Sequence, residues 1–254
     1  MTQTLAGDFD YDTHGRGYSR RRRPDPRIAA LIHTALGDAR TVLNVGAGAG
    51  SYEPGDRYVL AVEPSAAMRA QRPPGAAPAL AATAERLPFD DDAFDAVLAT
   101  VTVHQWRDTA AGLAELRRVA RGPVVVLTFD GDELDRLWLA EYAPELIAAE
   151  RRRYPAIATI AAAIGLTTDV LEVPIPFDCV DGFTEAYYAR PEAFLDPQVR
   201  AAQSAWGFIT PEATNRAVER LRSDLTSGRW QRTYGHLRTQ PQFVGSLRLL
   251  VGRP

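Results

Sequence analysis

The sequence contains no lysine, since all 29 basic residues are arginine. Schiff-base chemistry, a phosphate-binding P-loop lysine and a lysine general base are therefore excluded. The single cysteine, Cys179, can form neither an internal disulfide nor a thiolate metal site, so we expect no metal and a reducing, cytoplasmic environment. No apolar run reaches the roughly 18 residues of a membrane span, and residues 1–26 lack the apolar core of a secretory signal, so we expect no membrane partner.

The charge balance gives no sign of a polyanionic partner either. The formal net charge is -3 and the isoelectric point is about 5.9, which gives no general attraction to nucleic acid. With 46% hydrophobic and 24% charged residues, the chain has the composition of an ordinary globular protein. We expect a small-molecule substrate and no nucleic-acid partner; the sequence indicates no oligomeric state.

Strand and helix patterns alternate through the first half of the chain. Residues 1–26 are polar and end in two prolines, which predicts an extended arm before a helix over residues 27–36. A second helix is expected within residues 108–122, since Asp108 or Thr109 can cap it and Gly122 can end it. The predicted strands are Val42–Val45, Tyr58–Val62, Ala79–Ala82, Phe94–Ala99 and Val124–Phe129. This alternation predicts an α/β fold, with a parallel sheet covered by helices on both faces.

The pattern changes after Asp130. Helical periodicity dominates residues 132–166, "DVLEVPIPFD" is strand-like, and residues 181–238 are aromatic-rich and helical. A last strand-like run, "FVGSLRLLVG", closes the sequence. We therefore expect one domain over residues 1–254, with a helical insertion at residues 181–238 that covers the substrate before the final strand.

The stretch "TVLNVGAGAGSYEPGDRYVLAVEPS" has the outline of a nucleotide-binding unit. Gly46, Gly48 and Gly50 directly follow a predicted strand, and Glu63 ends the next one, where a carboxylate can bind a ribose diol. Only residues 51–57 remain for the helix that normally holds a pyrophosphate, which is one turn at most. A ligand with a ribose but no phosphates loses nothing by this, so S-adenosylmethionine is favoured over NAD(P).

These residues also resemble a known family. "VLNVGAGAG", "VLAVEPSAAM", "ATAERLPFDDDAFDAVLATVTVHQW" and "GLAELRRVARGPVVVLT" are together similar to the class I S-adenosylmethionine-dependent methyltransferases. The small-molecule branch that includes quinone-biosynthesis methyltransferases is the most similar. The match covers roughly residues 8–129 in consecutive order. The resemblance implies a Rossmann-like, mostly parallel sheet with an antiparallel last strand, and S-adenosylmethionine as the cofactor.

The resemblance further implies which residues contact that cofactor. Glu63 would bind the ribose hydroxyls and Met68 would pack against the adenine, whose acidic partner in the family is replaced here by Thr83. The arm would fold over the cofactor and hold its carboxylate. The implied cofactor-binding residues are Tyr18, Arg23, Gly46, Ala47, Gly48, Glu63, Met68, Thr83, Ala84, Glu85, Thr100 and Val101.

His104 is the candidate catalytic residue. It follows the fourth predicted strand, at the sheet edge where ligands approach, and a histidine pKa near neutrality suits a general base. The alternative is a histidine that only shapes the pocket. Candidate substrate-binding aromatics are Trp106, Tyr187, Tyr188 and Trp206, for which core packing is the alternative.

The acceptor itself stays open at this stage, because oxygen, nitrogen and carbon methylation use the same cofactor. A phenolic or enolic metabolite would suit His104 and the aromatic residues. The run "TVTVHQW" differs from the Asp/Asn-Pro-Pro-aromatic run of amino-methylating nucleic-acid enzymes. The alternative functions are an NAD(P)-dependent oxidoreductase and a non-catalytic S-adenosylmethionine-binding protein.

Overall fold

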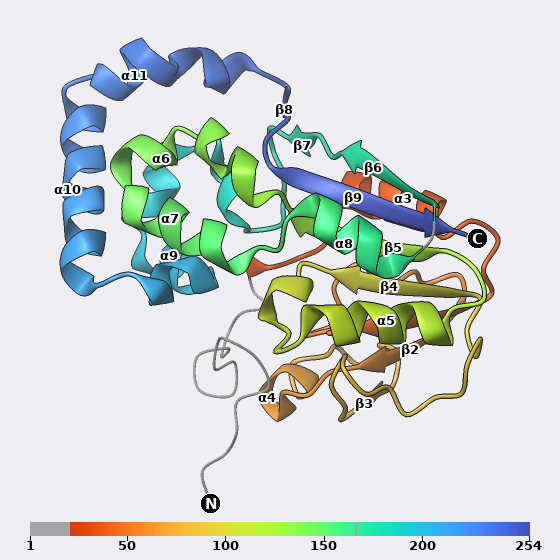
Figure 1. Cartoon of the computed structure of the whole chain (residues 1–254). Coiled ribbons are helices and arrows are strands. Elements are labelled where there is room, and N and C mark those ends of the chain that lie inside the picture. The colour runs from red at the N-terminus through yellow and green to blue at the C-terminus, as the bar shows by residue number, and fades with distance from the viewer. Residues whose placement is uncertain (1–20, 166) are drawn as a thin grey trace, which may run out of the picture.

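A computed structural model describes residues 21–165 and 167–254 and has a seven-stranded sheet at its centre (Figure 1). The strands lie in the order β3-β2-β1-β4-β5-β9-β6. All neighbouring strands pair in parallel except β9, which is antiparallel to both β5 and β6. This confirms the predicted sheet. The bounds are β1 (Thr41–Val45), β2 (Tyr58–Val62), β3 (Ala79–Leu80), β4 (Ala96–Thr100), β5 (Val124–Phe129), β6 (Thr167–Glu172) and β9 (Leu247–Arg253).

Helices cover both faces of the sheet (Figure 1). Ile28 and Ile32 of α3 pack with the sheet residue Leu98 in one apolar cluster. Leu116 of α5 and Ile160 of α8 belong to a second cluster on the opposite face. The α-helices are α3 (Pro26–Ala35), α4 (Ala66–Arg69), α5 (Thr109–Val119), α6 (Leu139–Tyr142), α7 (Pro144–Arg153), α8 (Ile157–Ile164), α9 (Pro197–Ala201), α10 (Pro211–Thr226) and α11 (Arg229–Tyr234).

The central strands are built from continuous apolar runs because both of their faces are covered. Every residue of β4 and β5 is buried, as expected for parallel strands between two helical layers. The edge strand β6 is largely exposed. The carboxyl ends of β1, β2 and β4 therefore meet at one buried edge of the sheet, where a parallel α/β fold binds its ligands.

Side-chain caps begin α3, α5 and α10, and the cap of α5 is Asp108, one of the two that the sequence offers. Asp25 precedes α3 and accepts the Arg27 N–H at 3.0 Å, and Asp108 accepts the Ala111 N–H at 2.9 Å. Thr210 caps α10 in the same way. Each side-chain oxygen pairs with an N–H group that the first helical turn leaves without a partner.

The region after β5 is helical, but much of it is 3₁₀ rather than α. Short 3₁₀ turns alternate there with α9 and α10, and the last predicted strand is split into β8 (Gln242–Phe243), which pairs with β7 (Ile175–Pro176), and β9. The split falls at Gly245, where a Cβ would lie 2.4 Å from the Glu185 carboxylate. The 3₁₀ helices are η1 (Val103–Gln105), η2 (Gly131–Arg136), η3 (Thr184–Tyr187), η4 (Pro191–Leu195), η5 (Ser204–Phe208) and η6 (Gly235–Thr239).

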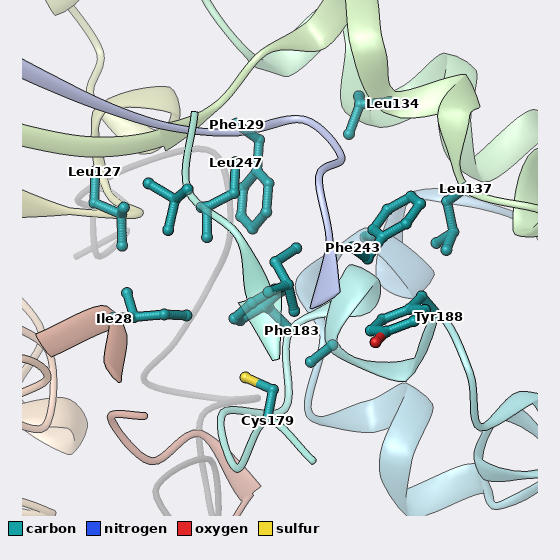
Figure 2. Packing of buried hydrophobic residues seen from close by; sticks show 14 of the residues in the cluster. Ile28, Leu127, Phe129, Leu134, Leu137, Cys179, Phe183, Tyr188, Phe243 and Leu247 are labelled. Carbon is teal, nitrogen blue, oxygen red and sulfur yellow. The ribbon is translucent and has the colours of Figure 1, made fainter. Parts of the chain in front are cut away.

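One continuous apolar cluster joins the sheet to this helical region. Figure 2 shows Leu127 and Phe129 of β5 in the same cluster as Phe183, Tyr188 and Cys179 from the chain after β7. Cys179 is buried in this cluster, and burial raises the pKa of its thiol to about 12. The cysteine is therefore a packed, unreactive residue.

Candidate functional site

A first hollow lies at the carboxyl ends of β1, β2 and β4; we call it the glycine hollow. The empty space there, including the part open to solvent, amounts to about 440 Å³. Gly46 and Gly48 adopt φ values of 67° and 53°, which a residue with a Cβ adopts only at a cost. The lining residues are Gly46, Ala47, Gly48, Ala49, Ser51, Glu63, Met68, Thr100, Val101, Thr102 and Gln105.

Glu63 is held at the floor of this hollow by the backbone around it. One carboxylate oxygen accepts the Gly48 N–H at 2.8 Å and the other accepts the Ser65 N–H at 2.8 Å. The side chain is only 7% exposed. Each carboxylate oxygen carries two lone pairs, so a carboxylate in this position can both fix the glycine turn and accept hydrogen bonds from a ligand.

The other implied cofactor-binding residues fall into two groups. Met68, Thr100 and Val101 line the glycine hollow beside the glycines. Thr83, Ala84 and Glu85 do not line it; Glu85 accepts the Arg107 N–H at 2.9 Å and Ala84 packs in the core. Arg23 is exposed, and Tyr18 lies outside the described residues.

No helix follows the glycine turn within residues 51–57, as its length predicts. Tyr52 lies in this connection with φ 62°, and its hydroxyl donates to Asp181 at 2.8 Å. Asp181 also pairs with Arg22 at 2.7 Å. The connection is thus tied to the helical region by a buried polar network, and no helix dipole is available there for a pyrophosphate.

Gly46 offers a direct test of how tightly this turn is built. A Cβ at Gly46 would lie 2.1 Å from Thr102 Oγ1 and 2.9 Å from Thr102 Cβ. We expect Gly46→Ala to lower the free energy of unfolding by about 2–4 kcal/mol, because the left-handed backbone and the overlap with Thr102 both cost energy. Urea unfolding measures this.

The matched control is Gly37→Ala, at a position with φ 57° and no atom within 4 Å of the added Cβ. This variant carries only the backbone cost, about 1–2 kcal/mol. Equal losses for the two variants would show that Thr102 does not press on the turn.

A second hollow lies between the sheet edge and the helical region; we call it the insertion hollow. The empty space there, including the part open to solvent, amounts to about 620 Å³. Figure 2 shows four of its apolar residues, Phe129, Leu134, Leu137 and Phe183. Val101 and Gln105 line both hollows, so the two adjoin. The lining residues are Arg22, Val101, His104, Gln105, Phe129, Leu134, Leu137, Leu146, Ile147, Glu150, Tyr154, Phe183, Thr184, Glu185, Gln203, Ser204 and Ala205.

Val101 stands at the junction of the hollows in a strained conformation. Its φ is 50°, which is rare for a β-branched residue and costs of the order of 1–3 kcal/mol. Its N–H donates to Leu127 O at 2.7 Å, which holds it against β5. Backbone strain of this kind concentrates at functional sites.

His104 lines the insertion hollow from η1. Its ring lies 4.4 Å from the Tyr154 ring, centroid to centroid, and its Nε2 lies 3.3 Å from Gln105 Nε2. Burial first, and then the nearby cations Arg153 and Arg22, lower the pKa of His104 well below its usual 6.5. The imidazole is therefore neutral at pH 7. Its buried Nδ1 has no hydrogen-bond partner among the described residues.

The predicted substrate-binding aromatics do not line either hollow. Trp106 packs on α5, since a Cβ at Gly112 would lie 2.5 Å from its ring. Tyr188 is fully buried and its hydroxyl donates to Gln240 O at 2.6 Å. Tyr187 lies edge-on to Phe194, and Trp206 lies tilted against the same ring. Trp106 thus packs beside the sheet, and the other three pack within the helical region.

Most of the residues that line the insertion hollow were not found from sequence; Val101 and His104 are exceptions. Tyr154, Glu185 and Gln203 belong to no motif, and each reaches the hollow through a turn that the periodicity does not place. Glu150 is paired with Arg153. A carboxylate and a guanidinium three residues apart on α7 are the only local signal, and such pairs are common on helices.

Glu185 is the most unusual of these groups. Both of its carboxylate oxygens accept the Ser246 N–H, at 2.9 and 3.1 Å, and the side chain is 2% exposed. Burial raises the pKa of Glu185 to about 7, against the opposing effect of these hydrogen bonds and of Arg248. The group therefore titrates near neutrality inside the insertion hollow.

This raised pKa predicts a stability difference that depends on pH. The folded protein keeps the Glu185 proton where the unfolded chain has lost it, so the free energy of unfolding falls as pH rises from 4.5 to about 7. In the Glu185→Gln variant the amide cannot titrate. We expect the free energy of unfolding of this variant, relative to wild type, to rise by about 3 kcal/mol across this window.

Urea unfolding of both proteins at pH 4.5, 6 and 8 measures that difference. Subtracting the wild-type free energy of unfolding from that of the variant at each pH removes the contribution of His104, which both proteins share. That contribution has the opposite sign, because the lowered pKa of His104 favours the folded state as pH rises. A difference that stays constant between pH 4.5 and 8 would contradict the raised pKa of Glu185.

Two negative findings concern the described residues only. Within residues 21–165 and 167–254, no helix combines the length and the apolar character of a membrane span. The same residues contain no group of three or more histidine, cysteine, aspartate or glutamate side chains arranged to hold a metal ion.

Comparison with protein families gives one match in the region of the glycine hollow. Residues 43–126 match the family model Methyltransf_11, a methyltransferase domain. The match begins in β1 and ends in β5, so it contains Gly46, Glu63 and the junction residue Val101. No curated protein matches the chain significantly.

Solved structures give a match over nearly the whole chain. A protein described as a methyltransferase of an antibiotic biosynthesis pathway from Anabaena variabilis ATCC 29413 is 27% identical, with a TM-score of 0.86, over 93% of this chain and 100% of its own. A protein from Thermotoga maritima described as a SAM-dependent methyltransferase is 20% identical, with a TM-score of 0.54, over 65% of this chain and 84% of its own. The [4+2]-cyclase SpnF is 14% identical, with a TM-score of 0.52, over 90% and 80%. The last two show the fold alone, and a fold can host several chemistries.

Proposed function

We propose that this S-adenosylmethionine-dependent methyltransferase methylates a small, largely apolar molecule that binds in the insertion hollow. The enzyme class and the cofactor follow from the methyltransferase family model over residues 43–126 and from the 27%-identical structure. The main observation in support of an acceptor in the insertion hollow is that the two hollows adjoin at Val101 and Gln105. A methyl donor on one side and an acceptor on the other would meet there.

The residues of the glycine hollow fit the cofactor by their chemistry. Glu63 offers carboxylate lone pairs for ribose hydroxyls, and the left-handed turn at Gly46 and Gly48 lines the hollow with backbone. Met68 lies beside Gly48, within 3.3 Å of where a Cβ would be, and can pack against the adenine. The bound sulfonium supplies the methyl group, so no acid is needed for its leaving group.

The residues of the insertion hollow would align the acceptor and remove its proton. Nine of the lining residues are apolar or aromatic (Val101, Phe129, Leu134, Leu137, Leu146, Ile147, Tyr154, Phe183 and Ala205), so they exclude water and would fix a flat molecule in place. We propose His104 as the general base. In the structure the Gln105 amide nitrogen lies 3.3 Å from Nε2. The base role therefore requires the amide to turn so that its oxygen accepts the Nε2–H, which leaves the lone pair on Nδ1 for the acceptor proton.

A phenolic or enolic acceptor suits this arrangement best, because it presents an acidic O–H next to an apolar body. The sequence resemblance to quinone-biosynthesis methyltransferases supports a flat acceptor of this kind. The wall is built largely from apolar and aromatic residues, which favours a small molecule over nucleic acid, since nucleic acid needs a cationic groove.

Narrowing the insertion hollow tests this proposal. Ala205 lines the hollow and is buried, so Ala205→Leu would extend an isobutyl group into the acceptor space. With methyl-labelled S-adenosylmethionine and a panel of one- and two-ring phenols and enols, we expect KM for the accepted compounds to rise at least about tenfold. Binding of S-adenosylhomocysteine should not change.

The matched control is Ala201→Leu, at an exposed position on α9, which should leave both values unchanged. Label that enters RNA or protein instead of small molecules would contradict the proposal. An Ala205→Leu enzyme with wild-type KM would show that the acceptor binds elsewhere.

A further inference from the structure

The side-chain amide of Gln203 has a fixed orientation at the wall of the insertion hollow. Gln203 is 5% exposed and lies directly before η5. Its Oε1 lies 2.8 Å from the Thr184 hydroxyl and 3.3 Å from Trp206 Nε1. An indole N–H only donates, so the atom of Gln203 that faces Trp206 must be the oxygen. The NH₂ group of Gln203 therefore faces away from Thr184 and Trp206.

This NH₂ group has no acceptor in the described protein. Gln203 Nε2 is buried and has no hydrogen-bond partner there, although Gln203 and Thr184 both line the insertion hollow. A buried donor without a partner costs about 1–3 kcal/mol, and native proteins contain few of them. A ligand atom that accepts its hydrogen bond would recover that energy.

The charged groups on the same wall are already paired. Glu150 forms an ion pair with Arg153, and Arg22 pairs with Asp181 at 2.7 Å. Glu185 accepts the Ser246 N–H through both oxygens. Glu185 also has a pKa of about 7, so it carries only part of a negative charge at neutral pH. The wall thus offers a free neutral donor rather than a free carboxylate.

We infer that Gln203 is a specificity-determining residue that donates a hydrogen bond to an oxygen atom of the acceptor. The inference rests on the proposed function, because it assigns the insertion hollow to the acceptor. The selected class is an apolar molecule with a carbonyl, carboxylate or phenolate oxygen. A compound of the same shape with an ammonium group in place of the oxygen leaves the Gln203 donor unpaired, and it is excluded.

Three probes with one ring system and different polar groups test this selection. We would titrate 2-naphthoate, 2-naphthol and 2-naphthylmethylamine into the wild-type protein saturated with S-adenosylhomocysteine, using calorimetry. We expect the naphthoate and the naphthol to bind at least tenfold more tightly than the amine. An amine that binds as tightly as the naphthoate, or a protein that binds none of the probes, would overturn the assignment.

Gln203→Glu replaces the donor by an oxygen of nearly the same shape. We expect it to weaken naphthoate at least tenfold and to bind the amine more tightly than naphthoate, an inversion that loss of packing cannot produce. Gln203→Leu, without the new charge, should weaken naphthoate and naphthol about tenfold and leave the amine unchanged; it decides the question if the glutamate variant does not fold. The control Gln242→Glu makes the same change at an exposed position on β8 and should alter nothing.

The affinity for S-adenosylhomocysteine separates two kinds of failure. Gln203 does not line the glycine hollow, so its variants should bind S-adenosylhomocysteine as the wild type does. Unchanged probe affinities in these variants would refute the role of Gln203 and leave the acceptor site standing. Probe affinities that are the same in Ala205→Leu as in the wild type would refute the proposed acceptor site itself.

Discussion

Replacing His104 by alanine is expected to lower kcat by about 10²–10⁴-fold, the usual contribution of a positioned general base. His104 Nδ1 is buried without a partner among the described residues, and its ring is held against Tyr154. Removing the imidazole leaves the acceptor proton without a base, while the glycine hollow is untouched. Single-turnover transfer of a labelled methyl group to an accepted phenol measures the change.

The pH dependence of the same reaction separates a base from a group that only shapes the hollow. The pKa of His104 lies well below 6.5. Protonation of His104 should therefore leave kcat of the wild-type enzyme constant down to pH 6.5 and lower it only at more acidic pH. His104→Asn retains a polar side chain of similar reach but cannot take up a proton. Wild-type rates in both variants, with normal binding of S-adenosylhomocysteine, would remove the base assignment.

Replacing Glu63 by glutamine is expected to weaken S-adenosylhomocysteine binding by at least about 100-fold. Hydrogen bonds to a charged group contribute about 1.5–3 kcal/mol each, and tenfold in affinity corresponds to about 1.4 kcal/mol. The neutral amide would no longer offer a charged acceptor to the two ribose hydroxyls. It would also turn an NH₂ group toward the Gly48 or Ser65 N–H, which the carboxylate now accepts.

Calorimetric titration with S-adenosylhomocysteine measures this loss, with NADH as a parallel ligand. The matched control is Asp56→Asn, which also changes a carboxylate to an amide but at an exposed position in the same connection, and should bind normally. Unchanged affinity in Glu63→Gln would contradict the assignment of Glu63 to the ribose.

The sheet could be predicted from sequence because its signals are local. The apolar runs that form β2 and β5 have the predicted bounds, since only buried strands favour uninterrupted valine and leucine. Asp108 marks the start of α5 in the sequence because its side chain can cap the helix. The region around Gly46 and Glu63 was predictable for the same reason, because turn glycines and a strand-ending acid lie close together in the chain.

The wall of the insertion hollow could not be predicted because its contacts are long-range. Glu185 meets Ser246 from 61 residues away, and Gln203 obtains its orientation from the folded turns η3 and η5. Trp106 follows His104 by two residues, yet it turns to α5 because Gly112 leaves space for its ring. Aromatic residues in the insertion were visible in the sequence, but which of them face the hollow depends on 3₁₀ turns that have no periodic signal.

A crystal structure of the protein with S-adenosylhomocysteine tests the central claim most directly. We expect its ribose to lie on Glu63 and its sulfur at the junction of the hollows, beside Val101 and Gln105, facing His104. S-adenosylhomocysteine bound with its sulfur away from that junction would contradict the proposed acceptor site, because a methyl group could then not reach the insertion hollow.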